Sequence, residues 1–459
     1  MSKESIALNR FGLGARPVDA PPADPQAWLL SQMDAYDALP APWRTQPRSW
    51  VLARDWALRQ RSLRATPEAE RQALRETQQR QSRETYQAAV GARTASALQS
   101  TTPFMDRLVH FWANHFAVST EKQQVILTAG AFELDAIRPH VLGRFEDMLV
   151  AAVRHPAMLY YLDQTNSTGP DSQAGRRSAK RRARPQGLNE NLAREILELH
   201  TLGVRSGYTQ DDVTEFARAL TGWTVAGEGA ADGDDGDDGG ESFRFRPATH
   251  EPGQRLVLGR SYAEDGEKQA RAILRDLAAA PATARHVAFK MARHFVADDP
   301  PPALVARLAD TYQRSSGDLP ALYRTLVLSP EAWVDGPGKF KSPWDWSISS
   351  LRAFGRRELP GNQANNLLNG LGQPVWKPGS PAGYGDTAGA WAAPDALVRR
   401  VETAQRLAAQ SGGGRDARLL APQVLPGAFG EMTQRAIANA ESPTTALALL
   451  LACPEFLRR

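Results

Sequence analysis

A polar run near the middle of the chain, residues 189–200, constrains the fold more than any other segment. It reads Asn-Glu-Asn-Leu-Ala-Arg-Glu-Ile-Leu-Glu-Leu-His and has the apolar spacing of an amphipathic helix. Gly203 follows where a helix commonly ends, and Thr209 with Asp212 forms a near capping box that starts another helix. These signals predict two helices joined by a five-residue loop. We call the first of them the polar helix.

The polar helix is predicted to have two distinct faces. An apolar stripe for burial is formed by Leu188, Leu192, Ile196 and Leu199. Asn191, Glu195 and Glu198 follow one another along the edge of that stripe. Arg194 stands four residues from both Glu190 and Glu198, so it can pair with either acid, each exposed pairing contributing about 0.2–0.5 kcal/mol.

The chemistry open to this helix depends on its two inner carboxylates. Glu195 and Glu198, at positions i and i+3, can bind one metal ion or act as acid and base if their surroundings separate their pKa values. His200 lies on the far side of the helix from Glu198. A metal site would therefore have to recruit His115 or His250 from elsewhere in the chain.

A structural role for the same residues is the alternative, and the sequence leaves both open. In that role Asn189, Glu190, Asn191, Arg194 and Glu195 form a buried network in which every polar group has a hydrogen-bond partner. In the functional interpretation, the predicted catalytic residues are Glu195, Glu198 and His115, and the predicted ligand-binding residues are Asn189, Glu190, Asn191, Arg194 and His250.

A second informative helix is predicted over residues 102–115, with proline at its first position. Its apolar face is made by Phe104, Leu108, Phe111, Trp112 and His115. On such a face His115 can be a core residue whose neutral imidazole bonds a neighbour, or a site residue if a carboxylate of the polar helix lies beside it. His110 and Asn114, on the opposite polar face, are assigned structural roles.

Two short segments, residues 243–245 and 255–258, alternate between apolar and polar side chains and predict strands. The stretch between them, which contains proline and glycine, predicts the loop of a β-hairpin. His250 and Glu251 would lie at the tip of that loop. His250 therefore has two interpretations, one as a residue facing the polar helix and one as an ordinary loop residue.

The net charge of +4 conceals two opposite blocks, a basic one within residues 176–184 and an acidic one within residues 232–241. Both predict solvated loops, because glycine, serine and charged residues cannot bury enough apolar area to order themselves. No aromatic residues are interleaved with the basic block, which argues against nucleic-acid binding. The acidic block has Asp237 and Phe243 where an EF-hand calcium loop needs glycine and glutamate, so that motif is rejected.

The composition is that of a chain able to fold around a sizeable core, with 42% hydrophobic and 23% charged residues. Its one cysteine, Cys453, excludes an internal disulfide and a cysteine-based metal cluster. No segment has the length of apolar sequence that a membrane helix needs, and residues 1–12 lack the apolar run of an export signal. We therefore expect a cytoplasmic location by default.

Helical periodicity dominates the remaining sequence and predicts a mainly α fold. The expected architecture is a multi-helix orthogonal or bundle-like domain with a small β-hairpin and long irregular loops. We expect four regions: an N-terminal segment with an exposed helical hairpin (1–100), a helical core (101–225), the acidic insertion with the β-hairpin (226–262), and a C-terminal helical region packed on the same core (263–459).

A long stretch rich in glycine and proline, residues 375–391, interrupts the C-terminal region. Trp376, Tyr384 and Trp391 within it can clamp a sugar or peptide, or can pin the loop onto the helices.

Several of these segments resemble a bacterial family known as domain of unknown function 1800. The likeness is closest over the polar helix and the residues that follow it, 208–213 and 217–223. Other blocks similar to the family are residues 9–14, 111–116, 156–163 and 341–343. The resemblance implies a helical domain with no established reaction. It also implies a histidine followed by an acid at a place comparable to that of His250 and Glu251.

The resemblance also implies a genomic context. Family members are often encoded beside a sulfatase-like protein, and many carry an export signal, a point on which this chain departs. We therefore expect a ligand-binding or hydrolytic activity centred on the polar helix, or alternatively a non-catalytic scaffold for a sulfatase-like or other protein partner. The sequence does not decide between an enzyme and a scaffold, and it identifies no cofactor, leaving a divalent metal open.

Overall fold

A computed structural model describes residues 2–180, 187–227, 240–335, 338–411 and 415–459 of the chain. Within these ranges there are 22 α-helices and two antiparallel sheets of two strands each, which confirms the predicted mainly α fold. Much of the acidic block, the rejected calcium motif and part of the basic block lie outside the described residues.

The first half of the chain forms helices that range from three to 32 residues in length. Their bounds are α1 Lys3–Ser5, α2 Pro25–Asp34, α3 Ser49–Ala65, α4 Glu68–Gln99, α5 Pro103–His115, α6 Gln123–Phe132, α7 Phe145–Arg154, α8 Pro156–Tyr161, α9 Gln173–Lys180, α10 Asn191–Glu195 and α11 Gln210–Leu220. Three π-helical turns, Ile6–Phe11, Glu133–Ile137 and Ile196–His200, continue α1, α6 and α10.

Four short strands separate the two sets of helices: β1 Trp223–Val225, β2 Phe243–Phe245, β3 Arg255–Val257 and β4 Arg260–Tyr262. The helices that follow are α12 Glu267–Ala279, α13 Pro281–Phe295, α14 Pro302–Arg314, α15 Leu319–Leu328, α16 Pro343–Ala353, α17 Gly361–Gly370, α18 Ala388–Trp391, α19 Pro394–Gln410, α20 Ala417–Val424, α21 Glu431–Ala438 and α22 Pro443–Ala452. None of the described helices combines the length and apolar character that a membrane crossing requires.

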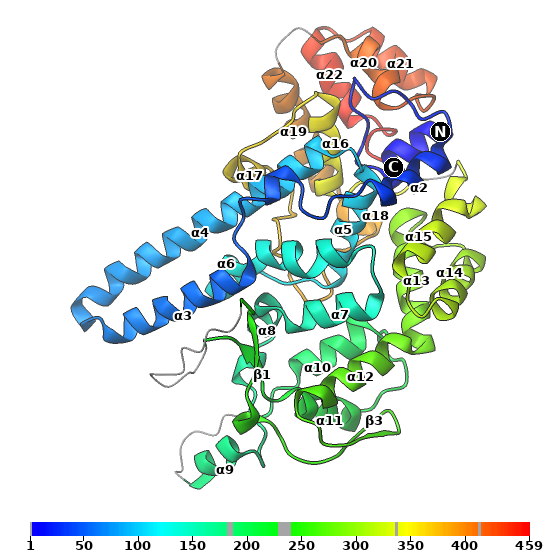
Figure 1. Cartoon of the computed structure of the whole chain (residues 1–459). Coiled ribbons are helices and arrows are strands. Elements are labelled where there is room, and N and C mark those ends of the chain that lie inside the picture. Colours follow the sequence, from blue (N-terminus) through cyan, green and yellow to red (C-terminus); the bar gives the residue numbers. More distant parts are fainter. Residues whose placement is uncertain (1, 181–186, 228–239, 336–337, 412–414) are drawn as a thin grey trace.

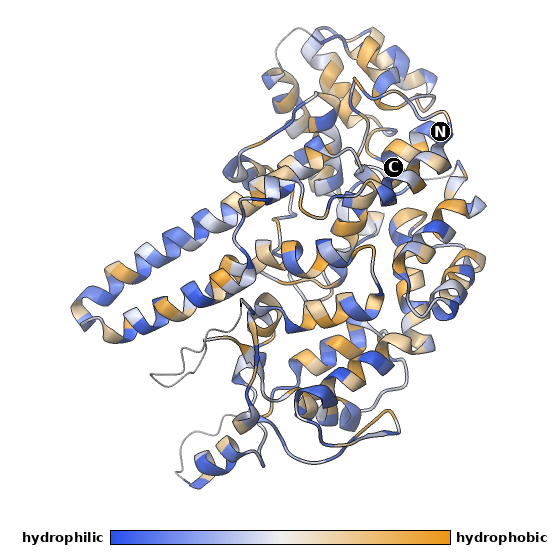
Figure 2. Cartoon of the chain, viewed as in Figure 1, coloured by the Kyte–Doolittle hydropathy of each residue, from blue (hydrophilic) through white to orange (hydrophobic). Residues whose placement is uncertain are grey.

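Helices α3 and α4 run antiparallel and project from the body of the molecule (Figure 1). Pro67 stands between them, at the N-cap of α4. The buried residues of α3 all lie within its first half, and those of α4 begin only at Gln78. Hydrophilic residues dominate along the projecting part (Figure 2).

The body contains one large apolar core and a smaller second one. The large core extends through the N-terminal and central helices, and its largest fully buried side chains include Trp43, Trp112 and Trp223. The smaller core is formed among α19 to α22. Helix α16 joins them, because its Ile348 belongs to the large core and its Trp346 to the small one. Packing against both cores therefore holds α16 in a fixed position.

The predicted hairpin between residues 243–245 and 255–258 is wrong. Strand β2 pairs with β1, placing Phe245 opposite Trp223, whereas β3 pairs with β4. The β3–β4 connection is a two-residue turn at Leu258 and Gly259, both with positive φ, as a tight hairpin requires. The predicted hairpin would have joined β2 to β3, two strands that belong to different sheets.

The polar helix begins as α10 and ends in the π-helical turn Ile196–His200. Because a π turn contains more residues than an α turn, side chains within it point in different directions from those expected at α-helical spacing. Leu197 and His200 are therefore fully buried, while Leu199 of the expected apolar stripe is only partly buried. The predicted Gly203 stop and the Thr209–Asp212 capping box are both present.

Candidate functional site

Asn189 ties the start of the polar helix to the segment before it. Its side-chain Nδ2 donates to the backbone oxygens of Leu162 and Asp163 at 3.1 and 3.0 Å, and its Oδ1 accepts from the Asn191 backbone at 2.9 Å. The Asn189 backbone N–H donates to Ser167 Oγ. Both amide hydrogens of Asn189 are thus used inside the protein, and the side chain of Asn191 is exposed.

Glu190 and Arg194 connect the polar helix to α11. The Glu190 carboxylate accepts hydrogen bonds from Thr214 Oγ1 at 2.7 Å, Gln210 Nε2 at 2.8 Å and Arg194 Nη2 at 3.2 Å. The bond from Thr214 contributes most to lowering the pKa of Glu190 below its usual range. These contacts hold two neighbouring helices together at their solvent-facing edge.

The two inner carboxylates, Glu195 and Glu198, have different surroundings. Glu195 is partly buried, and burial followed by the charge of Glu198 raises its pKa. Glu198 accepts a hydrogen bond from the Tyr208 hydroxyl and lies 4.0 Å from Arg194. Along this edge of the helix, therefore, the pKa of Glu195 is raised, whereas Glu198 is held by Tyr208 and lies near Arg194.

His115, grouped with those carboxylates in the catalytic prediction, lies in a cluster of imidazoles with His200 and His286. Its ring centroid is 6.2 Å from that of His200 and 6.1 Å from that of His286. His115 Nε2 donates to the His200 backbone oxygen, and His286 Nε2 donates to the Leu199 backbone oxygen, both at 3.0 Å. The polar helix therefore joins this cluster through the ring of His200 and the backbone oxygens of Leu199 and His200.

Burial keeps the imidazoles of this cluster neutral. It lowers the pKa of His115 well below its usual range, that of His200 to about 3 and that of His286 to about 4. Among the described residues, His115 Nδ1 and both ring nitrogens of His200 have no hydrogen-bond partner. Three buried nitrogens thus lack the compensation that buried polar atoms normally receive.

His250, predicted as a ligand-binding residue, makes its polar contacts away from the polar helix. Its Nδ1 lies 2.8 Å from the Thr221 backbone oxygen, and its Nε2 lies 3.3 Å from a Glu264 carboxylate oxygen. The Glu251 backbone N–H donates to Thr221 Oγ1, and the Glu251 carboxylate accepts from the Asp171 backbone. His250 and Glu251 therefore fasten the loop after β2 to neighbouring segments.

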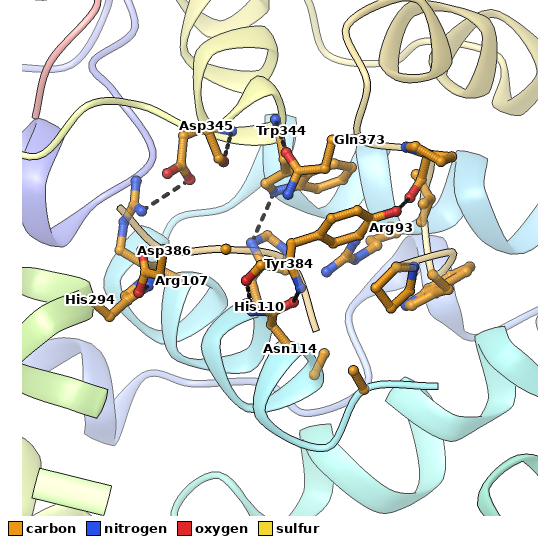
Figure 3. A pocket seen from close by; sticks show the side chains of 18 of the residues that line it. Arg93, Arg107, His110, Asn114, His294, Trp344, Asp345, Gln373, Tyr384 and Asp386 are labelled. Atoms are coloured by element: carbon orange, nitrogen blue, oxygen red, sulfur yellow. Dashed lines mark hydrogen bonds and ion pairs between the residues drawn. The ribbon is translucent and has the colours of Figure 1, made fainter. Parts of the chain in front are cut away.

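Two adjoining cavities lie between α5, α13, α16 and the loop of residues 373–386. The α16 cavity has a volume of about 90 Å³, and the α13 cavity has a volume of about 180 Å³. Both are smaller than the roughly 300–1,000 Å³ of sites for drug-sized ligands. Their linings share Asn114, His294, Tyr384, Gly385 and Asp386. We call the two cavities together the His294 pocket, and Figure 3 shows the α16 side of it.

Each cavity also has residues of its own. The α16 cavity is lined by Arg93, Arg107, His110, Trp344, Asp345 and Trp376, among others. The α13 cavity is lined by Phe111, His115, Lys290, Arg293 and Ala382. His115 is therefore the one predicted site residue that belongs to the pocket. The polar helix contributes no side chain to either lining.

His294 on α13 and Asp386 on the loop form a hydrogen-bonded pair in the wall that the cavities share. His294 Nδ1 donates to Asp386 Oδ2 at 2.9 Å, and His294 Nε2 is buried without a hydrogen-bond partner among the described residues. Lys339 and Arg459 lie 3.7 and 3.9 Å from Asp386 Oδ1.

These neighbours determine the charge of the pair. Burial opposes ionisation of Asp386, but His294, then Lys339 and Arg459, lower its pKa to about 2. Burial lowers the pKa of His294, although Asp386 opposes that shift. At neutral pH the pair is therefore a carboxylate bonded to a neutral imidazole whose Nε2 has a free lone pair.

A second carboxylate, Asp345 near the start of α16, binds two guanidinium groups. Arg107 Nη1 lies 3.0 Å from Asp345 Oδ1, and Arg459 Nε lies 3.2 Å from Asp345 Oδ2. Arg107 Nε also donates to the Gly12 backbone oxygen at 2.7 Å. Figure 3 shows the Arg107–Asp345 pair beside the cavity. These bonds hold the N-terminal segment, α5, α16 and the last residue of the chain in one wall.

Arg93 of α4 completes the polar lining of the α16 cavity. Its Nε lies 2.8 Å from a Glu133 carboxylate oxygen, and its guanidinium lies over the Trp344 ring at 4.4 Å and the Trp376 ring at 5.4 Å. Trp376 Nε1 donates to the same carboxylate at 3.2 Å. The charge of Arg93 is thus paired with Glu133 and stacked on aromatic rings.

The three aromatics of the glycine-rich loop are all bonded within the protein. Tyr384 donates its hydroxyl to the Pro374 backbone oxygen, and Trp391 Nε1 donates to the Gly385 backbone oxygen. Asn114 on α5 bonds the Tyr384 backbone in both directions, at 3.0 and 2.8 Å. Asn114 and the bond from Trp376 to Glu133 therefore attach the loop to neighbouring helices, and the attached loop forms one wall of the pocket.

No pattern in the sequence points to His294, Asp386 or Lys290 as site residues. His294 and Lys290 lie in an ordinary amphipathic helix, and Asp386 lies in a loop without regular spacing, so only tertiary packing brings them together. The polar face of α5 does indicate the pocket in the sequence, through His110 and Asn114, to which the sequence alone assigns structural roles. Both line the α16 cavity, and His110 Nδ1 accepts a hydrogen bond from Trp344 Nε1.

The sequence left a divalent metal open. In the ranges that the structure describes, no three histidine, cysteine, aspartate or glutamate side chains are arranged to hold a metal ion. Glu195 and Glu198 lie on one edge of the polar helix, whereas His115 lines the α13 cavity and His250 bonds to Thr221.

Comparison with known proteins covers nearly the whole chain. A family model described as "Protein of unknown function (DUF1800)" matches residues 6–458, a range that contains every segment forming the pocket except the final residue, Arg459. No curated protein and no solved structure matches the chain. The chain therefore belongs to the DUF1800 family, whose function is unknown.

Proposed function

We propose that the protein binds a small polar molecule in the His294 pocket and uses the His294–Asp386 pair as a general base. The observation that carries this proposal is the buried Nε2 of His294, which has a free lone pair and no partner among the described residues. A buried polar atom without a partner costs about 1–3 kcal/mol. A bound ligand or water that donates to Nε2 removes that cost.

The arrangement suits proton abstraction. Asp386 fixes the imidazole in the tautomer with the proton on Nδ1, which leaves Nε2 as the base. Hydrolysis is the reaction class we favour, because a neutral imidazole can take a proton from an attacking water molecule. In the α13 cavity, Lys290 and Arg293 bring two positive charges against the single carboxylate of Asp386, so the lining favours a substrate that is itself anionic.

In this proposal the polar helix positions side chains of the pocket but does not line it. The backbone oxygens of His200 and Leu199 accept from His115 and His286, which fixes the ring of His115 against the α13 cavity. The site that the sequence predicts at Glu195 and Glu198 has the raised pKa of Glu195 in its favour.

Equilibrium dialysis against a mixture of small carboxylic acids, sugars and phosphorylated metabolites tests this proposal. We expect at least one compound to be retained by the wild-type protein and to be hydrolysed slowly. In His294→Gln, which keeps the size of the side chain but removes the base, turnover of that compound should fall at least 100-fold. The matched control Glu195→Gln should turn it over at the wild-type rate.

The opposite pattern contradicts the proposal. Turnover that survives in His294→Gln but is lost in Glu195→Gln would place the activity on the polar helix. Retention of no compound at all would favour the alternative, a scaffold for a sulfatase-like or other protein partner. The projecting hairpin, with Leu58 at 53% exposure, offers a surface for such a partner.

A further inference from the structure

Lys290 stands out among the residues of the α13 cavity that the proposed base does not involve. It lies four residues before His294 on α13, so the two side chains share one face of the helix. Lys290 is only partly exposed, and its side chain lines the cavity. Within the described residues, its ammonium group has no carboxylate close enough for an ion pair; Asp386 acts on it only at longer range.

The surroundings make the neutral amine of Lys290 easier to form than that of an ordinary lysine. Burial lowers the pKa of Lys290 to about 8, and Asp386 opposes this shift only in part. After burial, the charge of Lys290 is also the largest cause of the lowered pKa of His115. A lysine that is desolvated in this way has about half of its amine neutral and nucleophilic near pH 8, whereas an ordinary surface lysine is almost wholly protonated there.

Proton acceptors lie in the same cavity lining. His294 and His115 are neutral, and each has one ring nitrogen without a hydrogen-bond partner among the described residues. Arg293 also lines this cavity and stacks on Phe289, with its guanidinium 4.3 Å from the ring. A guanidinium so positioned suits a carboxylate on the bound molecule.

We propose that Lys290 forms an imine with a small carbonyl compound that carries a carboxylate, of which a 2-oxo acid is the simplest. This inference rests on the proposed function because it places its ligand in the same pocket, and it adds imine formation as a step distinct from the hydrolysis favoured above. The cavity of about 180 Å³ suits a molecule of that size.

The chemistry balances without an oxidant or a reductant. The lone pair of the Lys290 amine forms a bond to the carbonyl carbon, and the electrons of the C=O double bond move to oxygen. A neutral imidazole of His294 or His115 carries a proton from nitrogen to that oxygen, giving a carbinolamine. The nitrogen lone pair then expels the hydroxyl group, which takes up a proton and leaves as water. One amine, one carbonyl compound and one proton give one protonated imine and one water.

Borohydride trapping tests this proposal with the full-length protein. The protein is incubated with pyruvate at pH 8, reduced with sodium borohydride, and analysed by intact mass and by peptide mapping. We expect one adduct per chain, on Lys290, at least tenfold above the level at any other lysine. The adduct should disappear in Lys290→Arg, which keeps the charge, and should persist in the control Lys268→Arg, where the lysine is exposed on α12.

Trapping no higher at Lys290 than at Lys268, or equal total trapping in Lys290→Arg, would overturn the proposal. Circular dichroism of Lys290→Arg establishes that the variant is folded before the comparison is made. The result is separable from the dialysis experiment. A ligand whose turnover depends on His294, together with no adduct on Lys290, leaves the proposed function standing and removes this inference alone.

Discussion

Replacement of Asp345 by asparagine is expected to lower the free energy of unfolding by about 3–5 kcal/mol. The Asp345 side chain is 8% exposed and binds the guanidinium groups of Arg107 and Arg459. Burial alone would raise the pKa of Asp345, but these two guanidiniums outweigh burial and hold it well below its usual range. Asparagine removes the compensating charge and leaves two buried cations close together.

Urea denaturation at pH 7 measures this loss, since urea does not screen charge. The control is Asp310→Asn, which breaks an exposed pair with Arg314 and should cost less than about 1 kcal/mol. A second substitution, Arg107→Met, should recover part of the loss in Asp345→Asn, because it removes one of the uncompensated charges. A loss within 1 kcal/mol of the control would show that Asp345 does not organise this wall.

The protein is expected to lose stability steeply as the pH falls from about 6.5 towards 4. Seven histidines have lowered pKa values, and burial is the leading cause for each: His110, His115, His140, His155, His200, His286 and His294. In the unfolded chain an imidazole binds its proton below about pH 6.5. The unfolded state therefore gains protons that the folded state does not bind, and acid favours unfolding.

His200 gives the sharpest test of this effect, because its pKa is lowered to about 3 and neither ring nitrogen has a partner among the described residues. Each buried neutral histidine contributes about 1.4 kcal/mol per pH unit between its folded and unfolded pKa values. At pH 5 the variant His200→Leu should therefore gain about 2 kcal/mol over wild type, relative to the difference between them at pH 7.5. Urea unfolding at both pH values measures this gain.

The comparison at pH 7.5 is the internal control, because at that pH wild-type His200 is largely unprotonated in both the folded and the unfolded state. If the unfolding free energies of variant and wild type differ by the same amount at pH 5 as at pH 7.5, His200 must take up a proton in the folded protein. It would then have to have an acceptor for its charge.

Local signals in the sequence were sufficient for helix ends. Proline at the first position of α5 and the Thr209–Asp212 capping box depend on neighbouring residues only, and both are present. The π-helical turn at Ile196–His200 makes the predicted buried face of the polar helix wrong at Leu199. Nothing in the spacing of apolar residues distinguishes this turn from α-helix. The predicted strand pairing is wrong because a two-residue turn at Leu258–Gly259 pairs β3 with β4 instead of β2.

The candidate site was harder to predict because its parts are distant in sequence. His294 and Asp386 are 92 positions apart, and Arg107 and Asp345 are 238 apart. Each looks ordinary in its own segment, and only packing makes them neighbours. The polar helix attracted the functional prediction because its polar residues are consecutive, yet Asn189, Glu190 and Arg194 bond to adjacent segments. His115 was selected for its place on an apolar face, and it does line the pocket.

The most direct test of the account is the protonation state of His294 in the folded protein. Nitrogen-15 spectra of histidine-labelled protein, with His294→Gln to assign the signal, distinguish the two neutral tautomers and the charged form. We predict a neutral imidazole at pH 7 with its proton on Nδ1 and none on Nε2, held by Asp386. A proton on Nε2, or a charged ring at pH 7, would contradict the account, because His294 would then have no lone pair with which to act as a base.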